Sequence, residues 1–430
     1  MRIVPNRNCD LSLFIVSHKK NDDWAELFSQ VRSALESLHI EYEVLIADNS
    51  INENARRLIE QNQYTLISPS IKNYGTMLRA AMEQMSGNYL ITMDADQIHS
   101  LDHLSNLWKA RNSAEIIIGS RYIQGGTDVM PAIRKILSRL SNFVFSRGLD
   151  LQVRDMSSAF RLYKSHVVKK LATESKDYDI LQEILVKALM EGYQITEIPF
   201  SHQSRDPAYA RAIKFGFAYI KTFTRLWKLR NSIASADYDA RAYNALMPPQ
   251  RYWQRQRYKI ITTLINENGR KKCLDVGCGS SRMIAALPQG SLALDILMRK
   301  LRYARRFGHP TLQGSIFNLP IPDQSTPSVL CSQVIEHVPR ANVLSELDRV
   351  LQPGGLLILG TPDYANWQWL VIEWLYKVLL PQAYADEHIT HYTYQELVNE
   401  FVSKRGYKLE AVKYILKGEL ILAMRKPPHQ

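Results

Sequence analysis

Asp94 and Asp96 are two carboxylates separated by a single residue, and they directly follow the apolar run at residues 89–93. An apolar run of this length, bounded by turn signals, predicts a buried strand of a parallel sheet. Because side chains alternate along a strand, both carboxylates point the same way from its carboxyl end, where open α/β sheets bind ligands. Two hard oxygen ligands suit Mg²⁺ or Mn²⁺, and such an ion can bridge a diphosphate. Two solvated acids in a loop are the alternative.

Glycines mark a second candidate site in the other half of the chain. Gly277 and Gly279 follow the strand predicted at residues 272–276, and Asp295 ends the next predicted strand. Glycine lets a ligand approach the backbone closely, and an acid about twenty residues further on is placed to bind ribose hydroxyls. The pattern predicts a nucleotide-like cofactor, and on its own it leaves a dinucleotide site open.

Both candidate sites need sheets that bring strand ends together, and both halves of the chain predict such sheets. Apolar runs alternate with segments of helical periodicity, which indicates βαβ units and a mostly parallel α/β sheet. In the first half, polar residues that follow the strands, including Asp48, collect at one edge. The predicted strands are residues 11–16, 42–47, 64–68, 89–93, 272–276 and 292–295, and the main predicted helices are residues 24–38, 76–84, 210–231 and 251–266.

Composition limits the classes of protein that fit. The chain has 430 residues, 46% hydrophobic and 22% charged, which is ordinary for two or three folded domains. Its net charge of +12 suits nucleotide diphosphates, anionic lipid or nucleic acid without choosing among them. No run reaches the ~18 apolar residues of a spanning helix, and residues 1–10 lack a signal-peptide core. The spacing of the four cysteines fits neither zinc nor disulfides, so we expect free thiols in the cytoplasm.

Six motifs in the first half occur in an order that is far more specific than any one of them. They are residues 44–50, 72–75, 93–96, 118–126, 155–161 and 197–199. With these motifs, residues 10–205 resemble a glycosyltransferase of family 2 with the nucleotide-diphospho-sugar transferase fold. Within that family, the likeness is to the dolichyl-phosphate mannosyltransferase and polyprenyl-phosphate glycosyltransferase branch.

The resemblance implies a site for a nucleotide-diphospho-sugar donor. Asp48 would contact the nucleobase or ribose, while Asp94 and Asp96 would hold the diphosphate through a metal ion. Arg121 and Arg161 would face anionic groups, and a structural salt bridge is the alternative for Arg121. The implied nucleotide-sugar-binding residues are Asp48, Asn73, Asp94, Asp96, Arg121 and Arg161.

Two acids are candidates for the general base that takes a proton from the acceptor. Asp155 stands where the family places an active-site acid, and Glu183 is the rival candidate. The chain departs from the family pattern D-A-D-x-Q-H, because Ile98 occupies the place of the metal-contacting Gln. Ala159 also stands where a Gly is usual. We still expect a metal, held by two carboxylates and water or by a locally shifted backbone.

A basic and aromatic helix is predicted at residues 210–231, directly after the transferase-like segment. Such a helix is typical of a membrane-surface element, and a helix that packs its aromatic side on its own domain is the alternative. The resemblance favours the membrane, because relatives use lipid-phosphate acceptors. The basic stripe consists of Lys214, Lys221, Arg225 and Lys228, and the aromatic stripe of Phe215, Tyr219, Phe223 and Leu226.

A second ordered set of motifs fills the other half, at residues 274–279, 294–295, 313–320, 334–338 and 351–359. Their order argues against a dinucleotide site, and residues 255–425 resemble a class I S-adenosylmethionine-dependent methyltransferase that modifies small molecules. In this resemblance, Asp295 binds the ribose, and Ser315 stands where an adenine-contacting Asp is usual. The implied cofactor-binding residues are Asp275, Gly277, Gly279, Asp295 and Ser315.

Histidines near the end of the chain are candidates for a catalytic base in this half. His388 and His391 are placed to take the proton of a hydroxyl acceptor. A loop histidine with a structural partner is the alternative. Glu336 and His337 end a predicted strand near the cofactor, where positioning is the more common role.

The sequence therefore predicts an α/β protein of two domains. A nucleotide-diphospho-sugar transferase fold at residues 1–208 is followed by a basic helix and linker at residues 209–250 and a Rossmann-like methyltransferase fold at residues 251–430. We expect Mg²⁺ or Mn²⁺ and S-adenosylmethionine as cofactors. The predicted location is the cytoplasm, with peripheral association at the inner face of the membrane.

The expected function is bifunctional. One half transfers a sugar from a nucleotide-diphosphate donor to a lipid-phosphate or glycan acceptor, and the other methylates a small-molecule, sugar or lipid hydroxyl, in cell-surface glycan or glycolipid biosynthesis. Because of the departures at Ile98 and Ser315, and at Ser328, which follows Pro327 where the family commonly has Phe-Asp, a single catalytic half with a docking or regulatory partner stays open. A nucleic-acid partner is not expected, since the basic residues are spread and no RNA-binding motif is present.

Overall fold

The chain divides into two compact α/β units. The computed structural model describes residues 9–17, 24–48, 52–67, 73–95, 101–129, 132–203, 216–245, 248–379 and 388–428. The first unit comprises Met1–Leu189 and Tyr193–Arg230, and the second comprises Met190–Gly192 and Asn231–Gln430. The helix expected at the joint is therefore part of the first unit, whereas residues 231–250 are part of the second.

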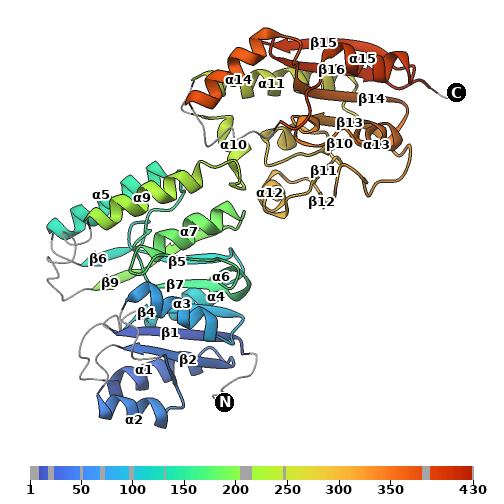
Figure 1. The fold of residues 1–430 in the computed structure, drawn as a ribbon. Helices are drawn as coiled ribbons and strands as arrows, with labels where there is room; N and C mark the ends of the chain where they lie inside the picture. Colours follow the sequence, from blue (N-terminus) through green and yellow to red (C-terminus); the bar gives the residue numbers. More distant parts are fainter. Residues whose placement is uncertain are drawn as a thin grey trace. The chain divides into compact units, whose positions relative to one another are not determined.

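The first unit is built on a seven-stranded sheet with the order β3-β2-β1-β4-β7-β5-β8 (Figure 1). β7 runs antiparallel to β4 and β5, and the other neighbours are parallel. The strands are β1 (Leu11–Ser17), β2 (Tyr42–Asp48), β3 (Thr65–Leu66), β4 (Tyr89–Asp94), β5 (Ile116–Ser120), β7 (Arg161–Lys164) and β8 (Ile195–Pro199), with a separate pair of β6 (Thr127–Val129) and β9 (Ser201–Gln203). The helices are α1 (Trp24–Glu36), α2 (Glu53–Gln61), α3 (Tyr74–Gln84), α4 (Leu101–Ala110), α5 (Ala132–Gly148), α6 (Ser165–Val168), α7 (Ile180–Met190) and α9 (Gly216–Arg230).

Burial patterns explain why these segments form strands and helices. Every residue of β1 and β2 is buried, as expected for continuous apolar runs in a parallel sheet. α1 turns Leu27, Val31 and Leu35 toward the core at helical spacing. Asn52 caps α2, because its side chain accepts a hydrogen bond of 2.8 Å from the backbone N–H of Ala55. The mostly parallel sheet predicted for this half is confirmed.

The second unit has its own seven-stranded sheet, with the order β12-β11-β10-β13-β14-β16-β15. Only β16 runs antiparallel, to both β14 and β15. The strands are β10 (Cys273–Val276), β11 (Leu292–Asp295), β12 (Thr311–Gln313), β13 (Thr326–Ser332), β14 (Leu351–Pro362), β15 (Lys408–Ile415) and β16 (Glu419–Arg425). The helices are α10 (Tyr238–Ala242), α11 (Pro248–Glu267), α12 (Met298–Ala304), α13 (Val343–Val350), α14 (Trp367–Leu379) and α15 (Tyr394–Val398), and the short helical turns include η2 (Arg282–Ala286) and η4 (Ile335–His337).

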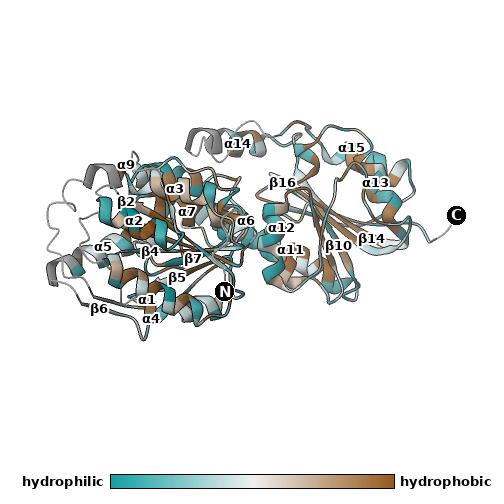
Figure 2. Ribbon diagram, turned by 90° about the horizontal axis from the view of Figure 1, so that it is seen from below, coloured by the Kyte–Doolittle hydropathy of each residue, from teal (hydrophilic) through white to brown (hydrophobic). Residues whose placement is uncertain are grey.

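Helices cover both faces of the second sheet. α13 and α15 pack on the face that carries Leu357 and Leu359, and α11 and α14 pack on the face that carries Leu356 and Ile358. Because successive residues of β14 point to opposite faces and both faces are covered, residues 356–359 of this strand are all apolar. Figure 2 shows the hydrophobic residues gathered along the central strands of each unit.

The four cysteines take no part in cross-links. Cys9, Cys273, Cys278 and Cys331 are all free and all buried, which confirms the expected free thiols. Burial raises the pKa of Cys9 to about 11 and that of Cys273 to about 12. In the described ranges, no helix has both the length and the apolar character needed to cross a bilayer.

Candidate active sites

The carboxyl ends of three neighbouring strands meet at one edge of the first sheet. Across β1 and β2, Ser17 is in register with Asp48, and across β1 and β4, Val16 is in register with Asp94. Asp48 is buried and Asp94 is half-buried. Asp96, which completes the predicted metal pair, lies outside the described residues, as does Ile98.

The start of α3 lies at the same edge. Tyr74 stacks on Tyr178 with 4.3 Å between the ring centroids. Burial, and then the nearby charge of Asp94, raises the pKa of Tyr74 well above its ordinary value. Asn73 directly precedes α3, and its half-buried side chain makes no capping hydrogen bond to the helix. Asn73, Asp48 and Asp94 therefore lie at one edge of the sheet.

Arg121 and Asp155 form a bidentate ion pair. Arg121 Nε donates to Asp155 Oδ2 at 2.7 Å, and Arg121 Nη2 donates to Oδ1 at 2.8 Å. Asp155 is fully buried, and the backbone N–H groups of Arg121 and Ser158 also donate to its carboxylate. Burial alone would raise the pKa of Asp155, but the Arg121 guanidinium outweighs it and holds that pKa below its ordinary value. The structural salt bridge considered for Arg121 is present, and Asp155 is a weak proton acceptor.

Arg161 has a different role from the one expected. Its guanidinium is fully buried and donates to the backbone carbonyls of Ser158 at 2.7 Å, Leu181 at 2.8 Å and Met156 at 2.6 Å. The prediction that Arg161 faces an anionic ligand is therefore wrong. Carbonyl oxygens satisfy the guanidinium, and Arg161 fixes the loop that carries Asp155.

Glu183 is also engaged inside the first unit. Its buried carboxylate lies 2.7 Å from Lys187 Nζ and 3.0 Å from Arg225 Nη1, and it accepts a hydrogen bond of 2.8 Å from the backbone N–H of Ser175. Burial opposes ionisation, but these donors, Arg225 first, lower the pKa of Glu183 to about 2. Such a carboxylate is a poor base at neutral pH. Glu183 instead fastens α9 to α7, and the base role predicted for it is not supported.

The glycine-rich turn of the second unit has the conformation that the sequence indicated. Gly277 and Gly279 follow β10 with φ angles of +70° and +55°, which only glycine adopts readily. A Cβ on Gly277 would collide with Val334, and one on Gly279 would lie 2.5 Å from the Asp239 carboxylate. The backbone N–H of Gly279 donates to Asp295 Oδ2 at 2.8 Å. The turn therefore leaves no space for a larger side chain at Gly277 or Gly279. Its hydrogen bond links the end of β10 to Asp295 at the end of β11.

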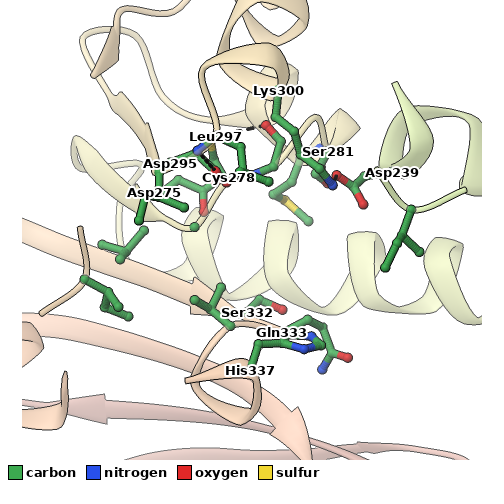
Figure 3. Close-up of a pocket in the computed structure, with 18 of the residues that line it drawn as sticks. Asp239, Asp275, Cys278, Ser281, Asp295, Leu297, Lys300, Ser332, Gln333 and His337 are labelled. Atoms are coloured by element: carbon green, nitrogen blue, oxygen red, sulfur yellow. Dashed lines mark hydrogen bonds and ion pairs between the residues drawn. The ribbon is translucent and has the colours of Figure 1, made fainter. Parts of the chain in front are cut away.

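A pocket of about 830 Å³ lies at this turn, within the usual range for small-molecule sites. In Figure 3, the turn and Asp295 line one side of the pocket, and Ser332, Gln333 and His337 line the other. The structure brings all the predicted cofactor-binding residues to this one pocket, namely Asp275, Gly277, Gly279, Asp295 and Ser315.

Two acids in the pocket are held in an environment of low polarity. Burial, and then the charge of Asp295, raises the pKa of Asp275 to about 7. Burial also raises the pKa of Asp295, although the N–H groups of Leu297 and Gly279 donate to its two oxygens at 2.8 Å. Those donors fix the Asp295 carboxylate in one orientation, and each oxygen keeps a lone pair for a ligand hydroxyl. A ligand that carries hydroxyls and positive charge would fit this wall.

Asp239 is a site residue that the sequence analysis missed. It lies on α10, and its carboxylate accepts from the backbone N–H of Ser280 at 2.9 Å and lies 2.8 Å from Lys300 Nζ. Burial opposes ionisation, but Lys300 outweighs it and holds the pKa of Asp239 below its ordinary value. The polar and aromatic segment Tyr238–Ala242, just ahead of the paired prolines, was the available signal.

The structure separates the two candidate histidines. His388 lines the pocket and its Nδ1 lies 2.7 Å from the hydroxyl of Tyr364. His391 stacks on the other side of Tyr364 with 4.0 Å between the ring centroids, and it is exposed and does not line the pocket. Of the two histidines, only His388 therefore lines the pocket.

Two family models match the chain at these two sites. The model described as "Glycosyl transferase family 2" matches residues 12–172, and the model described as "Methyltransferase domain" matches residues 274–359. Each match contains the polar strand ends described above.

Similar proteins include two polyprenyl-phosphate sugar transferases. A dolichol-phosphate mannosyltransferase of Pyrococcus furiosus is 27% identical over 52% of this chain and 65% of its own length. A polyprenol monophosphomannose synthase of Mycolicibacterium smegmatis is 32% identical over 27% of this chain and 46% of its own length. The chain thus spans about half to two thirds of the length of these relatives.

Two solved structures resemble parts of the chain. A glucosyl-3-phosphoglycerate synthase of Mycobacterium tuberculosis matches 51% of this chain and 78% of its own, with 10% identity and a TM-score of 0.42. An S-adenosylmethionine-dependent methyltransferase of Mesorhizobium loti matches 36% of this chain and 91% of its own, with 19% identity and a TM-score of 0.28. The family models carry the assignment: residues 12–172 match a glycosyltransferase family 2 domain, and residues 274–359 match a methyltransferase domain.

Proposed function

We propose that the chain is a bifunctional enzyme. Its first unit transfers a sugar from a nucleotide-diphosphate donor to a lipid phosphate, and its second unit methylates a hydroxyl of a glycan or lipid, in the synthesis of a cell-surface glycan or glycolipid. The observation that carries the proposal is the presence of two separate polar sites, each at the carboxyl ends of parallel strands in its own mostly parallel sheet.

In the first unit, Asp48 would contact the nucleoside, and Asp94 would act at the diphosphate. Asp94 at the end of β4 offers a hard oxygen ligand beside the start of α3, and this donor type fits Mg²⁺ or Mn²⁺. Asp94 and Asp96 would hold the ion, which would neutralise the charge of the leaving diphosphate. Both acids are therefore binding residues in this proposal.

The ion pairs of the first unit favour a phosphate acceptor over a hydroxyl acceptor. The two acids considered as bases, Asp155 and Glu183, are each held as anions by an arginine. A hydroxyl acceptor needs a group that takes its proton, whereas a phosphate oxygen is already ionised at neutral pH. A lipid phosphate thus suits the site better than a glycan hydroxyl does.

In the second unit, the pocket fits S-adenosylmethionine. The fixed Asp295 carboxylate would bind the ribose hydroxyls beside the glycine turn. When bound, the cofactor supplies an activated methyl group. Across the pocket, His388 would lie near the acceptor hydroxyl.

A surface formed by α5 and α9 is proposed to meet the membrane. The two helices lie side by side (Figure 1), and Phe145 contacts Phe223 with 5.2 Å between the ring centroids. Their outer side carries Phe143, which is 65% exposed, and Trp227, which is 46% exposed. Further exposed apolar residues there are Ile136, Leu140, Val144 and Ile220, and exposed basic residues are Arg139, Arg147, Lys221 and Lys228.

This surface differs from the stripe predicted for the helix. Arg225 points inward to Glu183 and Leu226 is fully buried, so the expectation of a basic stripe through Arg225 is wrong. Lys214 lies outside the described residues. An amphipathic surface with exposed aromatic and basic residues still has the character of a peripheral membrane element. We propose that it holds the enzyme at the lipid that carries the acceptor phosphate.

The two activities can be tested on the full chain in one design. The protein is mixed with vesicles that contain a polyprenyl phosphate, a panel of nucleotide-diphospho-sugars, Mn²⁺ and S-adenosylmethionine with a labelled methyl group. We expect labelled sugar in the lipid fraction first, and methyl label in the glycolipid product. If calorimetry shows no binding of S-adenosylmethionine, the methyltransferase half of the proposal fails. If no donor gives a glycolipid, the transferase half fails.

A further inference from the structure

Three side chains with metal-binding atoms come together beside the pocket of the second unit. They are Glu336 and His337 of η4 and His388 of the segment before α15, and one ligand atom of each lies within 4.8 Å of the others. The two segments are bound to each other, because the backbone N–H groups of Ile389 and Thr390 donate to the carbonyl of Glu336 at 2.8 and 3.0 Å. The cluster is therefore fixed by the backbone rather than by long flexible side chains.

Glu336 is the unusual member of this cluster. It is fully buried, and its Oε2 accepts one hydrogen bond of 3.1 Å from the hydroxyl of Thr361. Its Oε1 has no hydrogen-bond partner among the described residues. Buried carboxylate oxygens are normally satisfied by donors or by cations, because an unpaired one is destabilising. Glu336 thus has the environment of a ligand whose cation is supplied from outside the chain.

The histidines are oriented by neighbours, as metal-binding histidines usually are. The hydroxyl of Tyr364 lies 2.7 Å from His388 Nδ1, and the ring of Trp369 stacks on His388 with an interplanar angle of 19°. His337 and His388 face each other edge to face, with 4.8 Å between the ring centroids. A partner on one ring nitrogen fixes the ring and hence the direction of the other nitrogen.

The cluster opens onto the same pocket as the cofactor site. His337 and His388 line that pocket together with Asp295, and Figure 3 places His337 on the opposite wall from Asp295. Beside His337, the buried atoms Ser332 Oγ and Gln333 Nε2 also have no hydrogen-bond partner among the described residues. Buried polar atoms without a hydrogen-bond partner indicate that a polar ligand binds to this wall of the pocket.

We propose that Glu336, His337 and His388 bind a divalent transition-metal ion, and that this ion binds a hydroxyl oxygen of the methyl acceptor. Two imidazole nitrogens and one carboxylate oxygen suit Zn²⁺, Mn²⁺, Fe²⁺, Co²⁺ or Ni²⁺ and leave coordination positions for oxygens of a ligand. The metal lowers the pKa of a bound hydroxyl, whose proton passes to water. The acceptor class is then a sugar or another polyol with an oxygen that can reach both metal and cofactor. This role of the ion rests on the proposed methylation of a hydroxyl.

Pulsed EPR of Mn²⁺ bound to the full chain tests the site. A second Mn²⁺ site at Asp94 and Asp96 would offer oxygen ligands only, so couplings from directly bound ¹⁴N report the cluster alone. We expect such couplings in the wild type, with weaker couplings in His388→Ala. His309→Ala is the matched control, because His309 belongs to the same unit but does not line the pocket, and it should leave the spectrum unchanged. Tyr364→Phe should weaken metal binding by about 10- to 100-fold, the usual effect of losing an orienting partner.

The outcomes separate this inference from the proposed function. A wild-type spectrum without ¹⁴N coupling at saturating Mn²⁺, repeated with Co²⁺ and visible absorption, overturns the metal site. The same result follows if His388→Ala retains the full coupling. Binding of S-adenosylmethionine, measured by calorimetry, shows that each variant is folded. If ¹⁴N couplings are present but no hydroxyl is methylated, the metal site stands and the proposed methylation fails. Methyl transfer that survives chelation and His388→Ala overturns the role of the metal in acceptor binding.

Discussion

At the scale of single residues, the environment of an acid decides its chemistry more than its place in a motif does. Asp155, Glu183 and Asp295 are all buried acids. Arginines hold the first two as anions, whereas backbone N–H groups orient Asp295 in a pocket. The first two are therefore parts of the framework, and the third is available to a ligand.

Removing the Asp295 carboxylate should weaken cofactor binding selectively. In Asp295→Ala the ribose hydroxyls lose a charged acceptor, and such hydrogen bonds contribute about 1.5–3 kcal/mol. The affinity for S-adenosylmethionine should therefore fall roughly 10- to 150-fold, at about 1.4 kcal/mol per decade. Calorimetric titration measures this change. Titration with nucleotide diphosphate and Mn²⁺ is the control and should be unchanged, because Asp48 and Asp94 belong to the other unit.

Glu183 predicts a pH dependence of stability in the first unit. Its pKa is lowered from an ordinary value of 4.5 to about 2 by the donors that overcome burial, Arg225 first. A lowered pKa stabilises the folded state above pH 4.5, and this stabilisation is lost as the pH falls toward 2. The full effect is on the order of 3 kcal/mol at about 1.4 kcal/mol per unit of pKa.

The pH dependence predicted for Glu183 is tested by measuring the free energy of unfolding in urea for wild type and Glu183→Gln between pH 7 and pH 3. Amide exchange of α9 gives the local stability. We expect the stability difference to be largest at neutral pH and to shrink below pH 4.5. A difference that stays constant across this range would contradict the assignment.

At the scale of elements, helical periodicity predicted α9 but not which side of it faces the domain. The partners of Arg225 lie on α7 and in the segment before it, more than forty residues earlier in the chain, and no local pattern reveals them. Similarly, α10 was placed in a linker, because a five-residue polar helix carries little periodicity of its own. Both elements acquire their roles only from tertiary contacts.

Apolar and basic side chains on the outer surface of α5 and α9 should both contribute to membrane binding. The salt dependence of binding should distinguish the two contributions. Phe143→Ser combined with Trp227→Ser should weaken vesicle binding by about 10-fold or more at any salt concentration, because burying such side chains stabilises by about 1.5–3 kcal/mol each. Lys221→Gln combined with Lys228→Gln should weaken it only at low salt, by about 1 kcal/mol per charge. Sedimentation with anionic and neutral vesicles measures both effects. Wild-type protein that fails to sediment with anionic vesicles at low salt would falsify the membrane proposal.

The contact between α10 and the glycine turn should support the cofactor pocket. In Asp239→Ala, Lys300 and the N–H of Ser280 lose a shared acceptor. We expect affinity for S-adenosylmethionine to fall by about 10-fold or more, given about 1.5–3 kcal/mol for hydrogen bonds to a charged group. Lys300→Met removes the same ion pair from the other end. The two substitutions together should therefore lower the affinity by much less than the sum of their separate effects.

At the scale of the whole molecule, the order of the motifs was enough to predict two α/β units and their families. Strands that are buried on both faces leave a strong apolar signal, and the positive φ angles of Gly277 and Gly279 favour glycine at those positions. The sequence could not show that Arg161 binds carbonyls or that His388 and not His391 lines the pocket. Arg161 contacts backbone carbonyls, and both histidines contact Tyr364, so a motif of side chains cannot predict either arrangement.

A substitution at the site of one unit should impair that site and leave the site of the other unit unchanged. Asp94→Ala should abolish or greatly reduce sugar transfer to polyprenyl phosphate, because a diphosphate loses a metal ligand, while binding of S-adenosylmethionine is unchanged. Asp295→Ala should weaken binding of S-adenosylmethionine and leave sugar transfer to polyprenyl phosphate unchanged. Methyl transfer to a purified glycolipid, supplied from outside, separates a true defect in the second unit from lack of substrate. Loss of both activities in either variant would contradict the independence of the sites.

Because all four cysteines are buried, we expect the folded protein not to react with maleimides. Alkylation needs an exposed thiolate, and burial raises the pKa of each thiol as well as shielding it. A single Phe143→Cys substitution would therefore place one reactive group on the wild-type background, at a position that is 65% exposed on α5. An environment-sensitive fluorophore attached there would report the depth of α5 in a bilayer during turnover, with no need to remove native cysteines first.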